Sequence, residues 1–248
     1  MDLTTLPVLS TLLDLAYTGL MALITLFTPA TGALSAAIAV VLVTLIVRAA
    51  LIPAGIAQAK AEQTRARLAP RLRELQKRHR GDRERLQRET MELYRAEGAS
   101  PFAGCLPILL QAPIVGLLYS VFLHPMIGGH ANELLTQTLF GVPLGTSLFG
   151  AVRAGSADPM TWIVIGCLVL AIALVGELTR RLFRPAPSDS PGASGIAAPP
   201  AGLLGVLQFA TAVVALFVPL AAGLYLLTTV TWTLVQRLVL RRRYPAPA

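Results

Sequence analysis

The segment from Ala37 to Lys60, AIAVVLVTLIVRAALIPAGIAQAK, constrains this chain most, because it is apolar enough to cross a bilayer and yet contains an arginine. A charge at membrane depth costs roughly 2.5–3.5 kcal/mol on insertion scales and about 10–17 kcal/mol in simulations of isolated helices. Arg48 precedes Pro53 and Gly55, where the span is expected to loosen, so it should lie within one leaflet, roughly 8–10 Å from that end. It is either a functional residue or an arginine that extends its guanidinium to the nearer headgroups.

Composition places the whole chain in the same class. Of the 248 residues, 54% are hydrophobic and only 14% are charged, and the apolar runs reach about 20 residues, the length that a bilayer requires. The net charge of +8 is concentrated in a few segments, which argues against a globally basic nucleic-acid-binding protein. Cys105 and Cys167 both fall in apolar segments, so we expect two buried thiols and no disulfide.

The predicted fold is an all-α membrane protein with five transmembrane helices, a cytoplasmic antiparallel helical hairpin and an N-terminal interfacial amphipathic helix. The expected spans are about 34–54, 101–124, 159–178, 203–218 and 220–240, with a tight turn at Pro219 between the last two. The chain then divides into an extracytoplasmic N-terminus (1–33), a first span (34–57), the hairpin (58–98), spans two to five (99–240, with an exterior loop at 125–158 and a linker at 179–202) and a basic tail (241–248).

Residues 7–27 are apolar, but their polar residues recur at helical spacing along one stripe, at Thr11, Asp14, Thr18 and Thr25. This pattern predicts a helix that lies in the membrane interface with its apolar face towards the lipid. The alternative is a true span, which Asp14 disfavours.

Residues 58–98 carry 12 cations and 7 anions, and leucines repeat at Leu68, Leu72 and Leu75. Two antiparallel helices joined near Gly81 fit this pattern. The segment is either a solvated charged loop or a docking arm for an anionic partner.

The cations also predict an orientation. The hairpin, the linker and the residues after span five hold 19 of the 21 lysines and arginines, whereas the 125–158 loop holds only Arg153. The positive-inside rule then places the hairpin, the linker and the C-terminus in the cytoplasm and the N-terminus outside. This arrangement requires an odd number of spans.

Polar side chains concentrate in the cytoplasmic half of several expected spans, with one near the middle of span two. The candidates are Arg48, Thr44, Gln111, Gln208, Thr228, Thr231, Trp232 and Gln236. This asymmetry favours a water-filled groove that is open to the cytoplasm and closed to the exterior, rather than a channel. Alternatively, each threonine bonds to its own helix and each glutamine joins two helices. For Arg48 we expect no carboxylate partner, because the nearest candidate, Glu177, is flanked by Arg180 and Arg181.

Three segments resemble the YidC/Oxa/Alb family of membrane protein insertases. MELYRAEGASPFAGCLPILLQAPIVGLLY (Met91 to Tyr119) is similar to the family signature LY-x-x-x-x-x-NP-x-GGCLP-x-x-x-Q-x-P-x-x-x-x-LY, with Ser100 and Ala103 as departures. TLIVRAALIP resembles the stretch that bears the family's groove arginine, and PLAAGLYLLTTVTWTLVQ the last span, although Leu226 follows Tyr225 where the family usually has tryptophan. The matching structural positions are Pro53, Gly104, Cys105, Pro107, Pro113, Pro219 and Gly223.

The resemblance implies an insertase and chaperone of the bacterial plasma membrane that works without ATP, cofactor or metal and is not an enzyme. Its partners would be newly made membrane proteins and the lipid bilayer, with the Sec translocon, the signal recognition particle pathway or the ribosome as further candidates and no nucleic acid bound directly. The length resembles the minimal, five-span, Gram-positive type.

Other functional classes find less support in the residues. A small transporter or lipid scramblase could use the same groove, but we find no internal repeat of the kind that transporters tend to show. His79, His124 and His130 lack metal-ligand spacing, and there is no glycine-rich phosphate loop.

Overall fold

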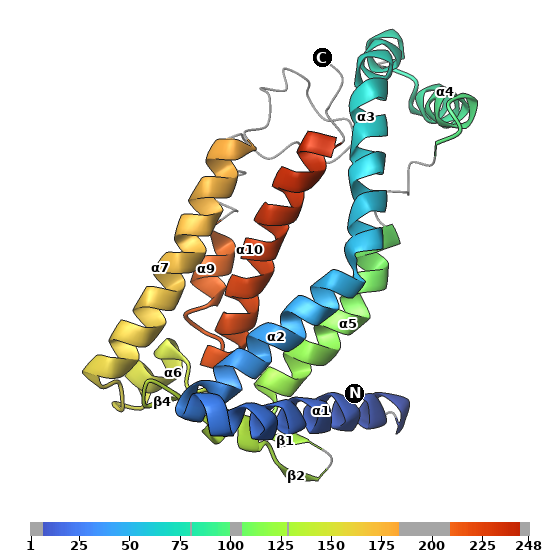
Figure 1. The fold of residues 1–248 in the computed structure, drawn as a ribbon. Helices are drawn as coiled ribbons and strands as arrows, with labels where there is room; N and C mark the ends of the chain where they lie inside the picture. The colour runs from blue at the N-terminus through green and yellow to red at the C-terminus, as the bar shows by residue number, and fades with distance from the viewer. Residues whose placement is uncertain (1–6, 80, 100–105, 128, 184–208, 244–248) are drawn as a thin grey trace.

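The computed structural model describes residues 7–79, 81–99, 106–127, 129–183 and 209–243, and the described chain is mostly helical (Figure 1). The long helices are α1 (Pro7–Thr31), α2 (Ser35–Ala50), α3 (Ile52–Arg78), α4 (Arg83–Ala96), α5 (Leu106–Leu123), α7 (Pro159–Leu182) and α10 (Leu220–Arg243). Shorter elements are the 3-10 helices η2 (Gly32–Leu34) and η3 (Glu133–Thr136) and the helices α6 (Leu148–Arg153) and α9 (Ala210–Val214). Two antiparallel strand pairs complete the fold, β1 (Met126–Ile127) with β2 (His130–Ala131) and β3 (Thr138–Leu139) with β4 (Val142–Pro143).

Three helical segments among the described residues are long and apolar enough to cross a membrane: Ser10–Ala50, Pro159–Leu182 and Leu220–Leu240. Their outward faces carry large apolar side chains, such as Ile46, Leu170 and Leu174, that are more than half exposed. Such continuous apolar faces are stable in lipid rather than in water. The chain is therefore a multi-pass α-helical membrane protein.

Cys167 corrects one expectation from the sequence. Its side chain is exposed rather than buried, and its thiol is free. It lies on the same face of α7 as Leu170 and Leu174, because residues three, four and seven apart share a helix face. A residue in an apolar segment of a membrane helix can therefore face outwards, and the apolarity of its neighbours does not show whether it is buried.

Helix α1 lies across the ends of α2 and α5 rather than alongside them (Figure 1). Leu13, Tyr17, Leu20 and Ile24 form its buried stripe. The Tyr17 hydroxyl accepts a hydrogen bond from the backbone N–H of Glu133 at 3.2 Å, which ties α1 to η3. The chain leaves α1 through η2, where Gly32 adopts a φ of +54° that only glycine adopts readily.

Helices α2 and α3 form one continuous helical path with a bend at Leu51. The backbone N–H of Leu51 donates to the Val47 carbonyl and that of Gly55 donates to the Leu51 carbonyl, both at 3.1 Å. Pro53 lacks an N–H and cannot donate to the Ala49 carbonyl, so the bend has an identifiable cause. The helical hairpin expected to begin at residue 58 is thus preceded by helix that already starts at Ile52.

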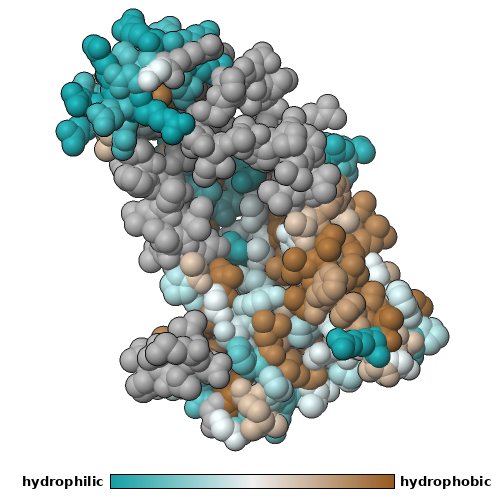
Figure 2. Space-filling model, turned by 180° about the vertical axis from the view of Figure 1, so that it is seen from behind, coloured by the Kyte–Doolittle hydropathy of each residue, from teal (hydrophilic) through white to brown (hydrophobic). Residues whose placement is uncertain are grey.

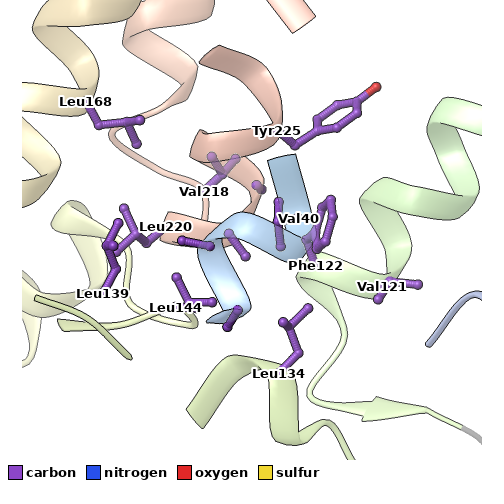
Figure 3. Close-up of a cluster of buried hydrophobic side chains, with 14 of the residues drawn as sticks. Val40, Val121, Phe122, Leu134, Leu139, Leu144, Leu168, Val218, Leu220 and Tyr225 are labelled. Atoms are coloured by element: carbon purple, nitrogen blue, oxygen red, sulfur yellow. The ribbon is translucent and has the colours of Figure 1, made fainter. Parts of the chain in front are cut away.

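The buried core lies at the end of the bundle where β1 to β4 are found, which we name the loop end (Figure 3). Val40 from α2, Phe122 from α5 and Leu220 from α10 meet there, together with Leu134 and Leu144 from the intervening segment. At the opposite end, from which α3 extends and which we name the α3 end, α7 and α10 bury far fewer side chains. The bundle is therefore tightly packed at one end only.

Polar side chains connect α3 to α4. The Nε2 atom of His79 lies 2.9 Å from a carboxylate oxygen of Glu89, and Arg71 forms an ion pair with Glu97 at 2.6 Å. The first pair lies closer to the turn between the two helices and the second pair lies further from it. This order of contacts is that of an antiparallel helix pair. Asp82 begins α4 by accepting a hydrogen bond from the backbone N–H of Arg85 at 3.0 Å.

Candidate functional site

The face of α2 that bears Arg48 becomes progressively less buried along the helix. Val40 is 0% exposed and Thr44 1% exposed, whereas Arg48, one turn further, is partly exposed. These residues are four apart and therefore lie on one face. The face that is sealed at the loop end opens at Arg48.

Helix α10 shows the same gradient. Ala221, Ala222 and Tyr225 are buried, and the following residues from Leu226 to Val230 are partly exposed. The rings of Tyr225 and Phe122 have their centroids 6.0 Å apart and join α10 to α5. Together with Val40, this aromatic pair forms a packed layer that we name the floor (Figure 3).

Arg48 occupies the last turn of α2. Among the residues that the structure describes, no carboxylate lies within ion-pairing distance of its guanidinium. Glu177 instead accepts hydrogen bonds from both Arg180 and Arg181 at 2.7 Å, as the sequence predicted. A cation in the last turn of a candidate membrane span, with no carboxylate partner among the described residues, requires solvation by water or by lipid headgroups.

Four residues of α10 share one helix face by spacing: Tyr225, Thr229, Trp232 and Gln236. Within this face Gln236 contacts Gly55 of α3, and Tyr225 packs against Phe122 of α5. Gly223 lies on the opposite face, where a β-carbon would meet the Leu168 side chain of α7. The structure thus brings Trp232 and Gln236 to the same side of α10, whereas Thr231 is exposed elsewhere.

The threonine hydroxyls behave in two ways. Thr44 donates to the Val40 carbonyl at 2.7 Å, and Thr228 donates to the Leu224 carbonyl at 2.8 Å, so both bond to their own helix. Thr229 differs, because its Oγ1 is buried and has no hydrogen-bond partner among the described residues. Sequence reasoning did not select Thr229; its seven-residue spacing from Gln236 was the available signal.

Several predicted site residues cannot be placed. Gln208, Gly104 and Cys105 lie outside the described residues, and Gln111 and Pro107 lie in α5 with side chains outside the described set. The remaining prolines occupy helix boundaries or interiors: Pro53 begins α3, Pro113 lies within α5 and Pro219 precedes α10. Among the described residues, no group of three or more histidine, cysteine or acidic side chains could hold a metal ion.

The surface view from behind shows how polar character is distributed (Figure 2). The helical pair α3 and α4 forms a strongly hydrophilic projection, and apolar residues cover an area in the lower middle and right of the described surface. Hydrophilic and near-neutral residues lie between the two. The molecule therefore presents polar residues next to a surface suited to lipid.

Comparison with known proteins gives a consistent result. The chain is 26% identical over 223 residues to a protein named Membrane protein insertase YidC from Streptomyces avermitilis, covering 85% of this chain and 52% of that protein. It is 29% identical to Inner membrane protein ALBINO3, chloroplastic, from Arabidopsis thaliana, covering 82% of this chain and 46% of that protein. It is 34% identical over 156 residues to a Membrane protein insertase YidC from Tropheryma whipplei, covering 55% of this chain and 50% of that protein.

The chain thus spans about half the length of these curated relatives. The model of the family described as 60Kd inner membrane protein matches residues 26–247, which include α2, α3, α5, α7 and α10. The matched region contains both Arg48 and the α10 face opposite it. The chain therefore belongs to the 60Kd inner membrane protein family, which is the YidC/Oxa/Alb family.

Proposed function

We propose that this protein is a membrane protein insertase and chaperone, which receives the polar segments of newly made membrane proteins in a hydrated groove lined by α2 and α10. The observation that carries the proposal is Arg48, a cation in the last turn of a membrane helix without a described carboxylate partner, beside a packed floor. The names of the relatives, two of which are insertases, support the same activity.

The proposed topology has five spans, with α3, α4 and the C-terminus in the cytoplasm of a bacterial cell. The loop end and α1 are then at the exterior, with α1 in the interface. The exposed apolar faces of α2, α7 and α10 support contact with lipid, and the clustered arginines support the orientation. In this orientation the groove opens to the cytoplasm and the floor closes it from the exterior.

The chemistry required of Arg48 is electrostatic. A client's acidic or polar N-terminal segment would enter the groove and meet a hydrated cation, which shortens the distance that the segment must cross in hydrocarbon. The client's apolar segment would then leave the groove laterally into lipid, and each Å² of apolar surface removed from water contributes about 25 cal/mol. No covalent step and no ATP hydrolysis is required, because partitioning supplies the free energy.

The packed floor distinguishes this mechanism from conduction. A pore needs polar lining along its whole length, whereas Val40, Phe122 and Tyr225 are almost completely buried in apolar contact. A client segment would thus be delivered across the outer leaflet only as its apolar part enters lipid. The projection formed by α3 and α4 would contact the client, the Sec translocon, the targeting pathway or the ribosome.

The test is complementation of cells depleted of their own insertase. We expect Arg48→Ala to lower insertion of a single-span client with an acidic N-terminal tail about tenfold, which corresponds to the loss of about 1.4 kcal/mol of attraction. Arg48→Lys should restore part of the activity, because a point charge suffices without the guanidinium fork. Arg153→Ala, which removes an exposed arginine near the loop end, is the matched control. Insertion by Arg48→Ala at the wild-type level would refute the proposal.

A further inference from the structure

The side chain of Gln236 contacts two residues at the α3 end of the site. Its Nε2 occupies the space in which a β-carbon of Gly55 would lie, so α10 and α3 approach each other closely here. Its Oε1 accepts a hydrogen bond from the indole Nε1–H of Trp232 at 2.9 Å. One amide is thus held between a glycine of one helix and an indole of its own helix.

This contact lies directly beyond the charged part of the site. Gly55 follows Arg48 by seven residues on one continuous helical path, and Gln236 follows Thr229 by the same number on α10. Seven residues are two turns, so each pair shares a helix face and is separated by about 10 Å. The pair Gly55 and Gln236 therefore closes the α3 end of the space that Arg48 and Thr229 face.

Glycine at position 55 needs an explanation, because glycine inside a helix is about 1 kcal/mol less favourable than alanine. The explanation is the lack of space, because a β-carbon at position 55 would collide with the Gln236 amide. Gly166 of α7 and Gly116 of α5 have open space where a β-carbon would lie, so close approach is not a general feature of the helical glycines.

We propose that Gln236 is a latch across the cytoplasmic mouth of the groove, seated on Gly55 and oriented by Trp232, and that an entering client displaces it. The inference rests on the proposed function and deepens it by naming the side chain that controls entry. A neutral amide suits this role, because it forms one hydrogen bond to Trp232 and its release requires only rotation of a side chain. The indole N–H that it leaves can then donate to a polar group of the client.

The experiment measures access to the groove rather than insertion. In the full-length protein in inside-out vesicles, Cys105 and Cys167 are replaced by serine and Thr229→Cys supplies a probe, because the hydroxyl that it replaces is buried. A charged, membrane-impermeant maleimide is added from the cytoplasmic side. We expect Gln236→Ala to increase the labelling rate at least fivefold, and Gly55→Ala to do the same by displacing the amide. The double substitution should match Gln236→Ala alone, since the side chain that alanine displaces is then absent.

The matched controls are Gly166→Ala, which makes the same change where space is open, and Gln58→Ala, which removes a glutamine that contacts Glu62 instead. Labelling rates for Gly55→Ala or Gln236→Ala that equal these controls would overturn the latch, and so would an increase in only one of the two. Client insertion measured in parallel separates the two proposals. If the variants are labelled faster but the wild-type protein inserts no client, the latch is supported and the proposed insertase function is refuted.

Discussion

The rings of Phe122 and Tyr225 meet with their centroids 6.0 Å apart and connect α5 to α10 at the depth where the site ends. Both side chains are almost fully buried, at 1% and 3% exposure. Tilted aromatic pairs of this kind contribute about 0.5–1.5 kcal/mol beyond the area that they bury. The contact is thus suited to keep the floor closed while the other end of the bundle opens.

We expect Phe122→Ala to destabilise the protein by about 3–5 kcal/mol, because it removes a large buried ring and leaves a cavity. Thermal unfolding in detergent, followed by circular dichroism, measures the loss. The control Phe140→Ala removes a ring that is 63% exposed and should shift the transition far less. Equal shifts for the two variants would show that the floor is not a packed layer.

The contact between Gly223 of α10 and Leu168 of α7 yields a second prediction. Gly223→Val should destabilise the helix pair by about 1–3 kcal/mol through overpacking. Leu168→Ala in the same chain should recover part of this loss, since it removes the atoms that the new side chain meets. The same substitution at Gly166, where space is open, controls for the change in helix propensity from glycine to valine. Strictly additive losses would contradict the contact.

Thr44 and Thr229 distinguish a hydrated groove from a dry one. Thr44→Val should leave insertion unchanged within about twofold, because the hydroxyl already bonds to the Val40 carbonyl of its own helix. The Thr229 hydroxyl has no described partner, so in a dry interior its replacement by valine would stabilise the protein by about 1–3 kcal/mol. We expect no such stabilisation, because water in the groove satisfies this hydroxyl. The unfolding temperatures of Thr229→Val and wild type decide between the two.

Glu97 connects α3 and α4 through Arg67 at 3.1 Å and Arg71 at 2.6 Å. Both arginines are more than half exposed, so Glu97→Gln should cost no more than about 1 kcal/mol. Amide hydrogen exchange in α4, followed by mass spectrometry, should accelerate up to about fivefold at low ionic strength, and the difference should shrink in high salt. Glu92→Gln changes an exposed carboxylate of α4 that has no described ion pair, and should leave exchange unaltered. Exchange that is independent of salt would contradict the electrostatic origin.

Much of the architecture could be predicted from hydropathy, because apolar length and the expense of buried charge leave few alternatives for a chain of this composition. The helical membrane class was predicted and is confirmed. Glu177 was expected to be unavailable to Arg48 because arginines flank it, and it pairs with Arg180 and Arg181 in the structure. The start of α3 at Ile52 was not predicted, because Pro53 is equally compatible with a loop and with the first turn of a helix.

The details of the site depended on how α10 is rotated, which its sequence leaves open. Threonines at 228, 229 and 231 are equivalent by composition, and only the packing of Gln236 on Gly55 shows that Thr229 shares the face of α10 that contacts α3. Gly55 itself was interpreted as a point where the span loosens, although it is a point of close approach. Cys167 shows the complementary problem, because apolar neighbours cannot separate a lipid-facing position from a buried one.

The hydrogen bonds that join α2 to α3, from the Leu51 N–H to the Val47 carbonyl and from the Gly55 N–H to the Leu51 carbonyl, have a mechanical consequence. Since α2 and α3 form one helical path with a bend at Leu51, a force applied at the turn between α3 and α4 tilts both helices together. Arg48 lies on α2, three residues before that bend. A partner that pressed on α3 would thereby reorient Arg48 without contacting it.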